Sequence, residues 1–114
     1  MPRAIHKIIV LVVCLTGAAA YSLENLSPQR QQELIYLLHQ DCGSCHGMTL
    51  KGGLGPALLP ADLAGKPASY LREVIANGVP EKAMPPWKNI LQPREIDFLV
   101  QRLTQADNLS GQTP

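Results

Sequence analysis

Five consecutive residues constrain this chain more than any other stretch: Cys42, Gly43, Ser44, Cys45 and His46. Two cysteines separated by two residues and followed directly by a histidine are the arrangement that attaches a c-type haem. Within a helical turn both sulfurs face the same rim of a porphyrin, where each can add to one vinyl group. The adjacent histidine then lies under the iron and supplies an imidazole ligand. The motif predicts one haem c per chain, attached through Cys42 and Cys45, with His46 bound to the metal.

Other interpretations of this stretch are weaker. A redox-active Cys-x-x-Cys is expected near a strand–helix–strand pattern, and the sequence carries no strand pattern. A zinc site needs four ligands, usually with a second Cys or His pair at fixed spacing, and the only further cysteine is Cys14. Two ordinary buried cysteines beside an unrelated histidine would leave the preceding helix and the following glycine-rich loop unexplained.

The composition suits one small domain built around a cofactor. The chain has 114 residues, of which only 4% are aromatic, a thin supply for a core. A domain of this size is only marginally stable without a disulfide, a metal or a bound cofactor. A covalently held haem would fill the deficit, and folding would be coupled to it because it stabilises only the folded form. The formal net charge of +1 gives no argument for nucleic-acid binding.

Residues 1–20 are predicted to be a secretory signal peptide, and residues 21–114 the mature domain. Arg3 and Lys7 give a positive start, an apolar run follows, and Ala18-Ala19-Ala20 offers a cleavage site. The apolar run is shorter than the roughly 20 residues that a spanning helix needs. We therefore expect a mature chain with no membrane span, located in the periplasm. This location agrees with the attachment of c-type haem outside the cytoplasm.

Cys14 belongs to the predicted signal peptide and is given no role. A lipoprotein signal would have a small residue before the cysteine, and this chain has the bulky Val13.

Hydrophobic periodicity predicts an all-α domain with three main helices. Ser27 is suited to cap the first helix, and Gly78 follows the end of the second. The third helix carries apolar residues at i, i+3, i+4 and i+7. The helices are expected at about Pro28 to Asp41, Pro67 to Asn77 and Pro93 to Gln105, with loops at 47–59 and 79–91 and a short turn at 61–65.

Met84 is the candidate for the second axial ligand. Met48 lies two residues after His46 and reaches at most about 7 Å, too short to pass round the macrocycle to its other face. Met84 lies far enough along the chain, and Pro85 restricts its backbone to extended conformations. A methionine that fills a gap in the core is the alternative. His39 is a weaker candidate, because it lies on the first helix only seven residues before His46 and so on the same side of the haem.

Three further residues are candidates for contacts with the cofactor. The carbonyl of Pro56 could accept the other ring N–H of His46 and make the imidazole a better donor. Trp87 could pack against the ring or donate its indole N–H to a propionate. Leu71, Val74 and Ile75 make the buried face of the second helix, and Tyr70 is placed to join that face.

These residues resemble those of a class I monohaem cytochrome c: the motif after a first helix, a Gly-Pro loop, Met-Pro-Pro-Trp and a closing amphipathic helix. A narrower resemblance is to the small NirC-type cytochromes encoded with the cd-type nitrite reductase of denitrifying bacteria. It rests on the run from Asp41 to Pro60, on Asn77-Gly78-Val79-Pro80 and on Ala83-Met84-Pro85-Pro86-Trp87. The resemblance implies a cytochrome c-like fold, with three main helices and loops wrapped around one covalently bound haem.

The resemblance also implies a function. His/Met ligation saturates the iron, so we expect outer-sphere electron transfer rather than an enzyme. The implied partners are redox proteins, either cd-type nitrite reductase or the proteins of haem d1 assembly, and the chain is expected to be a monomer. The alternative is a haem-based gas sensor or enzyme in which Met84 is a labile ligand.

The loops also carry basic residues that bear on partner choice. A positive rim would steer an acidic partner, whereas scattered lysines would only aid solubility. The residues concerned are Lys51, Lys66, Lys82 and Lys88.

Overall fold

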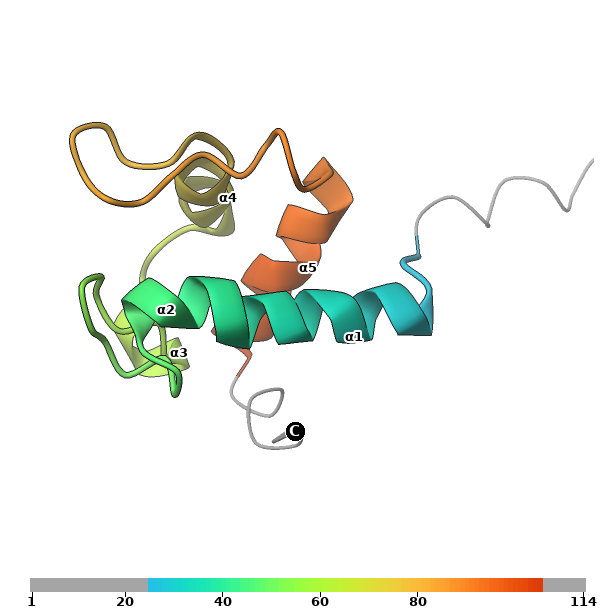
Figure 1. The fold of residues 1–114 in the computed structure, drawn as a ribbon, viewed down its shortest axis with the longest axis horizontal. Helices are drawn as coiled ribbons and strands as arrows, with labels where there is room; N and C mark the ends of the chain where they lie inside the picture. Colours follow the sequence, from blue (N-terminus) through green and yellow to red (C-terminus); the bar gives the residue numbers. More distant parts are fainter. Residues whose placement is uncertain (1–24, 106–114) are drawn as a thin grey trace, which may run out of the picture.

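The computed structural model describes residues 25–105, and within that range the chain is helical and has no strand (Figure 1). The all-α prediction is therefore confirmed, while the predicted signal peptide lies outside the described residues. No helix among residues 25–105 has the length and apolar character needed to cross a membrane. The elements are α1 (Pro28–Leu37), the π-helical turn η2 (Leu38–Cys42), α2 (Gly43–His46), α3 (Pro60–Leu63), α4 (Ala68–Asn77) and α5 (Pro93–Thr104).

The first helix is longer than its sequence pattern predicts. It begins as expected, because the side chain of Ser27 accepts a hydrogen bond from the backbone N–H of Arg30 at 3.2 Å. It does not end at Asp41: η2 and α2 carry it on to His46, and Figure 1 shows the three elements as one rod. In η2 the N–H of Gly43 bonds the carbonyl of Leu38, five residues back. The motif thus lies inside the helix.

The second and third main helices start and stop close to the predicted residues. Pro67 caps α4 rather than lying in its first turn, and Gly78 ends it, with its N–H bonded to the carbonyl of Val74 at 2.9 Å. Pro93 is the first residue of α5. The predicted short turn is the single-turn helix α3, which begins at Pro60.

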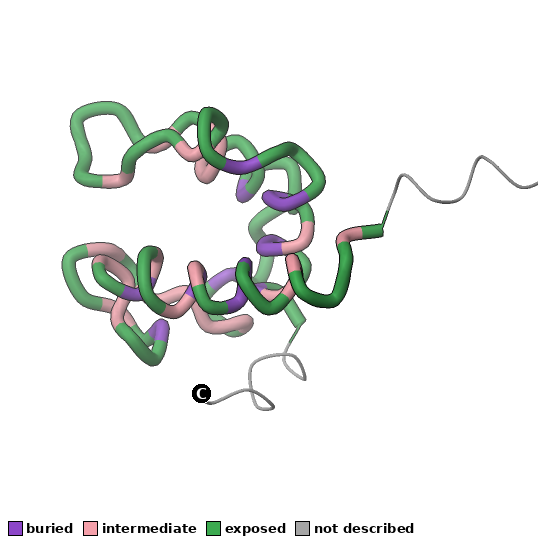
Figure 2. The backbone as a smooth tube through the Cα atoms, turned by 45° about the vertical axis from the view of Figure 1, so that its right-hand side comes forward, coloured by how far each residue is buried: buried purple, intermediate pink, exposed green. Residues whose placement is uncertain are grey.

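The core lies where α5 meets the other helices. Helix α5 contacts α1, α3 and α4, and Figure 2 shows the buried positions gathered around these contacts while the loops are mostly exposed. The core is aliphatic, and Trp87 and Phe98 pack against it only in part. Its buried members are Leu34, Leu38, Leu50, Leu63, Leu71, Leu91, Ile96, Leu99, Val100 and Leu103.

One of the residues predicted to join a buried face does not do so. Tyr70 is 53% exposed, whereas its neighbour Leu71 is buried. Successive helical residues point about 100° apart, so when Leu71 packs into the core Tyr70 is turned toward the flank. The prediction that Tyr70 is part of the buried face of α4 is wrong.

Ion pairs connect α5 to both of the other long helices. Glu95 is 5% exposed and accepts a hydrogen bond from the guanidinium of Arg30 in α1 at 2.6 Å. Its other carboxylate oxygen accepts the backbone N–H of Gln92 at 2.8 Å, which caps α5. Arg72 in α4 pairs with Asp97 in α5. These contacts fix the arrangement of the helices from which the two loops extend.

The two long loops lie at the same end of the molecule. Residues 47–59 connect α2 to α3, and residues 78–92 connect α4 to α5. In both Figure 1 and Figure 2 they extend to the side away from the beginning of α1. The 47–59 loop follows His46 and the 78–92 loop contains Met84, so both candidate axial ligands belong to this end.

Candidate haem-binding site

The two cysteines lie one helical turn apart and are not bridged. Cys42 ends η2 and Cys45 lies in α2, both are half-buried, and both are free thiols. Burial, with a smaller contribution from the charge of Asp41, raises the pKa of the Cys42 thiol to about 11. Redox-active Cys-x-x-Cys sites need a lowered thiol pKa. The Cys42 thiol therefore lacks the lowered pKa of a redox-active dithiol.

The imidazole of His46 is oriented by a backbone carbonyl. Its Nδ1 lies 2.7 Å from the carbonyl oxygen of Pro56. Because that oxygen can only accept, Nδ1 must carry the proton and donate it. In the neutral ring the other nitrogen, Nε2, then keeps an unprotonated lone pair, which is the form that binds a metal.

The 47–59 loop closes over the end of α2 and against the histidine ring. The backbone N–H groups of Gly52 and Gly55 donate to the carbonyls of His46 and Cys45, each at 2.8 Å. These carbonyls would otherwise be unpaired at a helix end. A Cβ on Gly55 would lie 2.8 Å from both Cε1 and Nδ1 of His46. The absence of a side chain at Gly55 is what lets the loop reach the ring.

Met84 is held in the 78–92 loop through the backbone. Its carbonyl accepts the N–H of Val79 at 3.2 Å. Just beyond it, the N–H of Trp87 donates to the carbonyl of Ile75 at 3.0 Å, and that of Lys88 to the carbonyl of Ala76 at 3.1 Å. Both acceptors belong to the last turn of α4, so the segment that carries Met84 is tied to the end of this helix.

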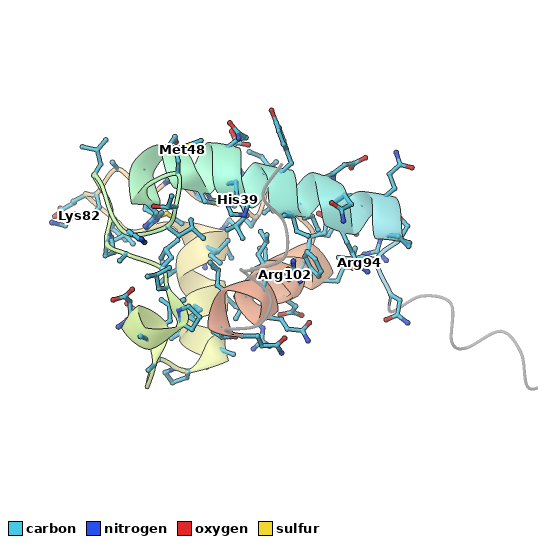
Figure 3. All side chains as sticks on the ribbon, turned by 90° about the horizontal axis from the view of Figure 1, so that it is seen from below. His39, Met48, Lys82, Arg94 and Arg102 are labelled. Carbon is cyan, nitrogen blue, oxygen red and sulfur yellow. The ribbon has the colours of Figure 1, made fainter. Side chains whose placement is uncertain are left out.

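The remaining predicted contacts have different surroundings. Trp87 is half-buried against the core, whereas Tyr70 is largely exposed. Met48 is 54% exposed and lies beside α2 (Figure 3), with its sulfur 3.4 Å from where a Cβ on Gly43 would be. His39 lies in η2 and is half-buried. Among residues 25–105, no group of three or more His, Cys, Asp and Glu side chains gathers as a metal cluster would require.

The donor set fits a covalently held haem. Two free thiols on one helical turn suit thioether bonds to a porphyrin rim, and the next residue presents an imidazole whose Nδ1 is already hydrogen-bonded. The 47–59 loop packs against that imidazole, and the thioether of Met84 belongs to the loop between α4 and α5. The candidate axial ligands are thus one imidazole nitrogen and one thioether sulfur.

Sequence reasoning missed two contacts around these ligands. Gly55 was expected only to let the backbone pass near the ring, and the structure gives it a definite neighbour in the His46 imidazole. Gly78 was expected only to end a helix, yet it also abuts the peptide that follows Met84. The signal for both is a glycine next to a motif residue, although spacing alone does not say what it touches.

Comparison with known proteins gives the same identification. Residues 29–101 match the family described as cytochrome c oxidase, cbb3-type, subunit III. The cytochrome c55X of Pseudomonas aeruginosa is 42% identical over 108 residues, which are 92% of this chain and 91% of the relative.

Two solved structures are also similar. One is the c-type cytochrome NirC, with a TM-score of 0.68 and 48% identity over 69% of this chain and 93% of that one. The other is dihydro-heme d1 dehydrogenase NirN in complex with DHE, with a TM-score of 0.60 and 36% identity over 70% of this chain but only 17% of that one. The chain belongs to the c-type cytochromes, whose haem is covalently bound, as a small member of the NirC type.

Proposed function

We propose that this cytochrome is a periplasmic electron carrier of nitrite respiration, with one haem attached through Cys42 and Cys45 and with His46 and Met84 as axial ligands. The observation that carries the proposal is the contact of 2.7 Å between Nδ1 of His46 and the carbonyl of Pro56. It leaves Nε2 as the only ring nitrogen with a lone pair, on the same helical turn as the two thiols. When bound, the haem supplies an iron that gains or loses one electron.

The residues around His46 favour rapid electron exchange. Gly55 and Pro56 both contact the imidazole and restrain it, so its position need not change with the charge of the site. Donation of the Nδ1 proton to a carbonyl increases the basicity of Nε2 and strengthens it as a ligand. A ligand fixed in this way keeps the structural rearrangement small when an electron arrives or leaves.

Met84 completes the site from the other loop. A thioether is neutral and raises the reduction potential relative to a second imidazole. The backbone bonds that join residues 84–88 to the end of α4 restrict where the thioether can lie. With both axial positions held by the protein, no position remains for peroxide, oxygen or nitrite, and the proposed role is therefore transfer rather than catalysis.

The names of the relatives support a partner that handles haem d1. One similar structure is of NirC, and another is of dihydro-heme d1 dehydrogenase, of which this chain matches a minor part. A domain of this kind that is fused to a haem d1 enzyme in one protein suggests that the separate chain serves a similar enzyme. We propose that the partner is cd-type nitrite reductase or an enzyme of haem d1 maturation.

The distribution of basic residues supports docking through the loop end. All four lysines of residues 25–105 are exposed and lie outside the helices; Lys51, Lys82 and Lys88 belong to the two long loops, and Lys66 lies between α3 and α4. The four arginines of the same range lie within α1, α4 and α5. Figure 3 shows Lys82 and Arg94 at opposite ends of the molecule. Lys88 also bonds the side chain of Asn77, at 2.9 Å. A positive rim of this kind would attract an acidic partner.

Electron exchange with purified cd-type nitrite reductase tests the partner. We expect rapid reduction of the reductase by the reduced cytochrome, with a rate that falls as ionic strength rises. The double variant Lys51→Ala/Lys82→Ala should have a lower rate and a weaker salt dependence, and Arg94→Ala is the control at the other end. A rate that is independent of salt would rule out electrostatic steering, and no exchange at all would rule out this partner.

Binding of small ligands separates a carrier from a gas sensor or enzyme. If His46 and Met84 hold both axial positions, the reduced protein should not bind carbon monoxide at neutral pH, and the oxidised protein should bind cyanide weakly. Rapid binding of either ligand by the wild-type protein would instead favour a labile Met84 and the alternative function.

A further inference from the structure

Gly78 occupies an unusual backbone position at the junction between α4 and the loop that carries Met84. Its φ is +69°, in the left-handed region that side chains other than glycine rarely adopt. Its N–H bonds the carbonyl of Val74 at 2.9 Å and so closes the last turn of the helix. These features alone would be satisfied by any helix-terminating glycine.

The surroundings of Gly78 go beyond that role. A Cβ on this residue would lie 2.6 Å from the carbonyl oxygen of Met84, 2.8 Å from the carbonyl carbon of Pro85 and 2.9 Å from the nitrogen of Pro86. All three are backbone atoms, so no side chain can swing aside to make room. The peptide units on either side of Pro85 therefore rest directly on the α-carbon of Gly78.

Two hydrogen bonds restrict the close contact between Gly78 and the Met84–Pro86 backbone. The residue after Gly78, Val79, donates its N–H to the same Met84 carbonyl at 3.2 Å. Trp87 is tied to the carbonyl of Ile75 at 3.0 Å, one turn back in α4. The backbone after Met84 thus lies between a hydrogen bond to Val79, just after α4, and one to Ile75 within α4, and it is in close contact with Gly78.

We infer that Gly78 is a positioning residue for the thioether of Met84. The inference rests on the proposal that Met84 is an axial ligand. The missing side chain sets how closely the Met84–Pro86 backbone approaches α4, and hence how far the sulfur reaches from it. Any Cβ at position 78 must push this backbone away from the helix and shift the sulfur from its place on the metal.

Gly65 provides a control for a side chain at a positive φ. Its φ is +78°, close to the +69° of Gly78, but a Cβ there would meet no atom within 4 Å. Gly65→Ala therefore adds a Cβ at a positive φ just after α3 without a collision. Loss of Met84 ligation in Gly78→Ala but not in Gly65→Ala would show that a side chain at a positive φ is not a sufficient cause.

The test uses the haem-loaded proteins, produced in the periplasm of a host that attaches haem c. In Gly78→Ala we expect loss of most of the weak long-wavelength sulfur-to-iron band of the oxidised protein, a lower reduction potential, and about tenfold tighter binding of added imidazole. Gly65→Ala should keep the wild-type band, potential and imidazole affinity. Band, potential and imidazole affinity unchanged in Gly78→Ala would overturn the inference.

Met84→Ala distinguishes this inference from the ligation on which it rests. If Met84→Ala keeps the band, the proposed ligation fails. If Met84→Ala loses the band while Gly78→Ala keeps it, only the role of Gly78 fails. In the double variant we expect the same potential and imidazole affinity as in Met84→Ala alone, because Gly78 acts through the thioether.

Gly78→Asn covers the case in which Gly78→Ala does not accumulate. Asparagine adopts a positive φ more often than alanine does, and it supplies the same Cβ, although the ψ of −171° at Gly78 lies outside the αL region that asparagine favours. It should lose the band as well, and retention of the band would contradict the inference. If neither variant yields a haem protein while Gly65→Ala does, Gly78 serves folding in general and the positional role is overturned.

Discussion

At the scale of single residues, the two candidate ligands are held by different means. The ring of His46 is fixed directly, through a hydrogen bond to Pro56 and a close contact with Gly55. Met84 is fixed through its peptide backbone, at the end of α4. Substitutions beside His46 should therefore change the strength of the imidazole as a donor, whereas those beside Met84 should change whether the thioether is bound.

Gly55→Ala tests the support of the imidazole. The added Cβ would lie 2.8 Å from Nδ1 and should displace the ring from the carbonyl of Pro56. A histidine without this bond is a weaker donor and stabilises the oxidised state less, so we expect a higher reduction potential by voltammetry. Gly65→Ala serves as the control, because its Cβ meets no atom within 4 Å. Equal potentials in wild type and Gly55→Ala would show that the contact has no influence on the ligand.

At the scale of elements, the regular parts of the helices follow from the sequence and the junctions do not. The proline starts, the glycine stop at Gly78 and the spacing of Ile96, Leu99, Val100 and Leu103 place α4 and α5 to within about two residues. The π-turn η2 leaves no trace in apolar spacing, because it changes the hydrogen-bond pattern and not the residue types. Its effect is that the helix continues through the motif.

Glu95 is a buried carboxylate that joins two helices, and the spacing of apolar residues does not predict it. It lies in the first turn of α5, is 5% exposed, and bonds both Arg30 and the N–H of Gln92. The hydrogen bond from Arg30 is the main cause that lowers the pKa of the Glu95 carboxyl, and it likewise raises the pKa of Arg30. The carboxylate therefore joins α1 to the capped end of α5.

Glu95→Gln should destabilise the protein by about 1.5–3 kcal/mol at neutral pH, the usual range for a hydrogen bond to a charged group. Because folding lowers the pKa of Glu95, its contribution is present above the unfolded value near 4.5 and is lost as pH falls through the lower folded value. Denaturant unfolding at several pH values measures this. The gap between wild type and variant should close below pH 4.5, and a gap that stays constant there would contradict the account.

Asp97→Asn is the comparison for this prediction. It breaks the pair between α4 and α5, in which both side chains are about half exposed. Exposed ion pairs typically contribute about 0–1 kcal/mol, so this variant should unfold close to wild type. If Asp97→Asn lowered the free energy of unfolding more than Glu95→Gln does, the Arg72–Asp97 pair would be the more important of the two, contrary to this account.

At the scale of the whole molecule, the described core is small and aliphatic, and the two loops beside the candidate ligands extend from it. Neither loop has regular structure beyond turns. The family explains this arrangement, because a covalently bound haem supplies the apolar body that the loops enclose. The fold should consequently depend on the cofactor, as the low aromatic content suggests.

The variant Cys42→Ala/Cys45→Ala, which cannot form thioethers, tests this dependence. The haem-free domain should have a free energy of unfolding near zero. In a chain of this size with no disulfide, metal or cofactor, the free energy gained by burying apolar surface is little more than the conformational entropy lost on folding. Far-ultraviolet circular dichroism at 25 °C should show much less helix than in wild type. Ser44→Ala, in the same turn, should melt like wild type, and an unchanged melting curve for the double variant would show that the fold does not need the haem.

The candidate site could be proposed from the sequence because its residues belong to local motifs. The motif residues, Met84 and Pro56 were chosen by type and spacing, and the structure brings Pro56 against His46. The burial of Tyr70 in α4 was predicted wrongly, because a residue one position from a buried leucine can face either way until the packing partner is known. The contacts of Gly55 and Gly78 join segments that only the folded loops bring together.

The measurement that tests the central claim most directly is the absorption spectrum of the haem-loaded protein, oxidised and reduced, beside that of Met84→Ala. We expect a c-type reduced spectrum in both, and a weak long-wavelength sulfur-to-iron band in the oxidised wild type that Met84→Ala lacks. That result would establish Met84 as the ligand opposite His46 in an electron carrier. A c-type spectrum without the band, unchanged in Met84→Ala, would contradict the account and favour an open or differently occupied iron.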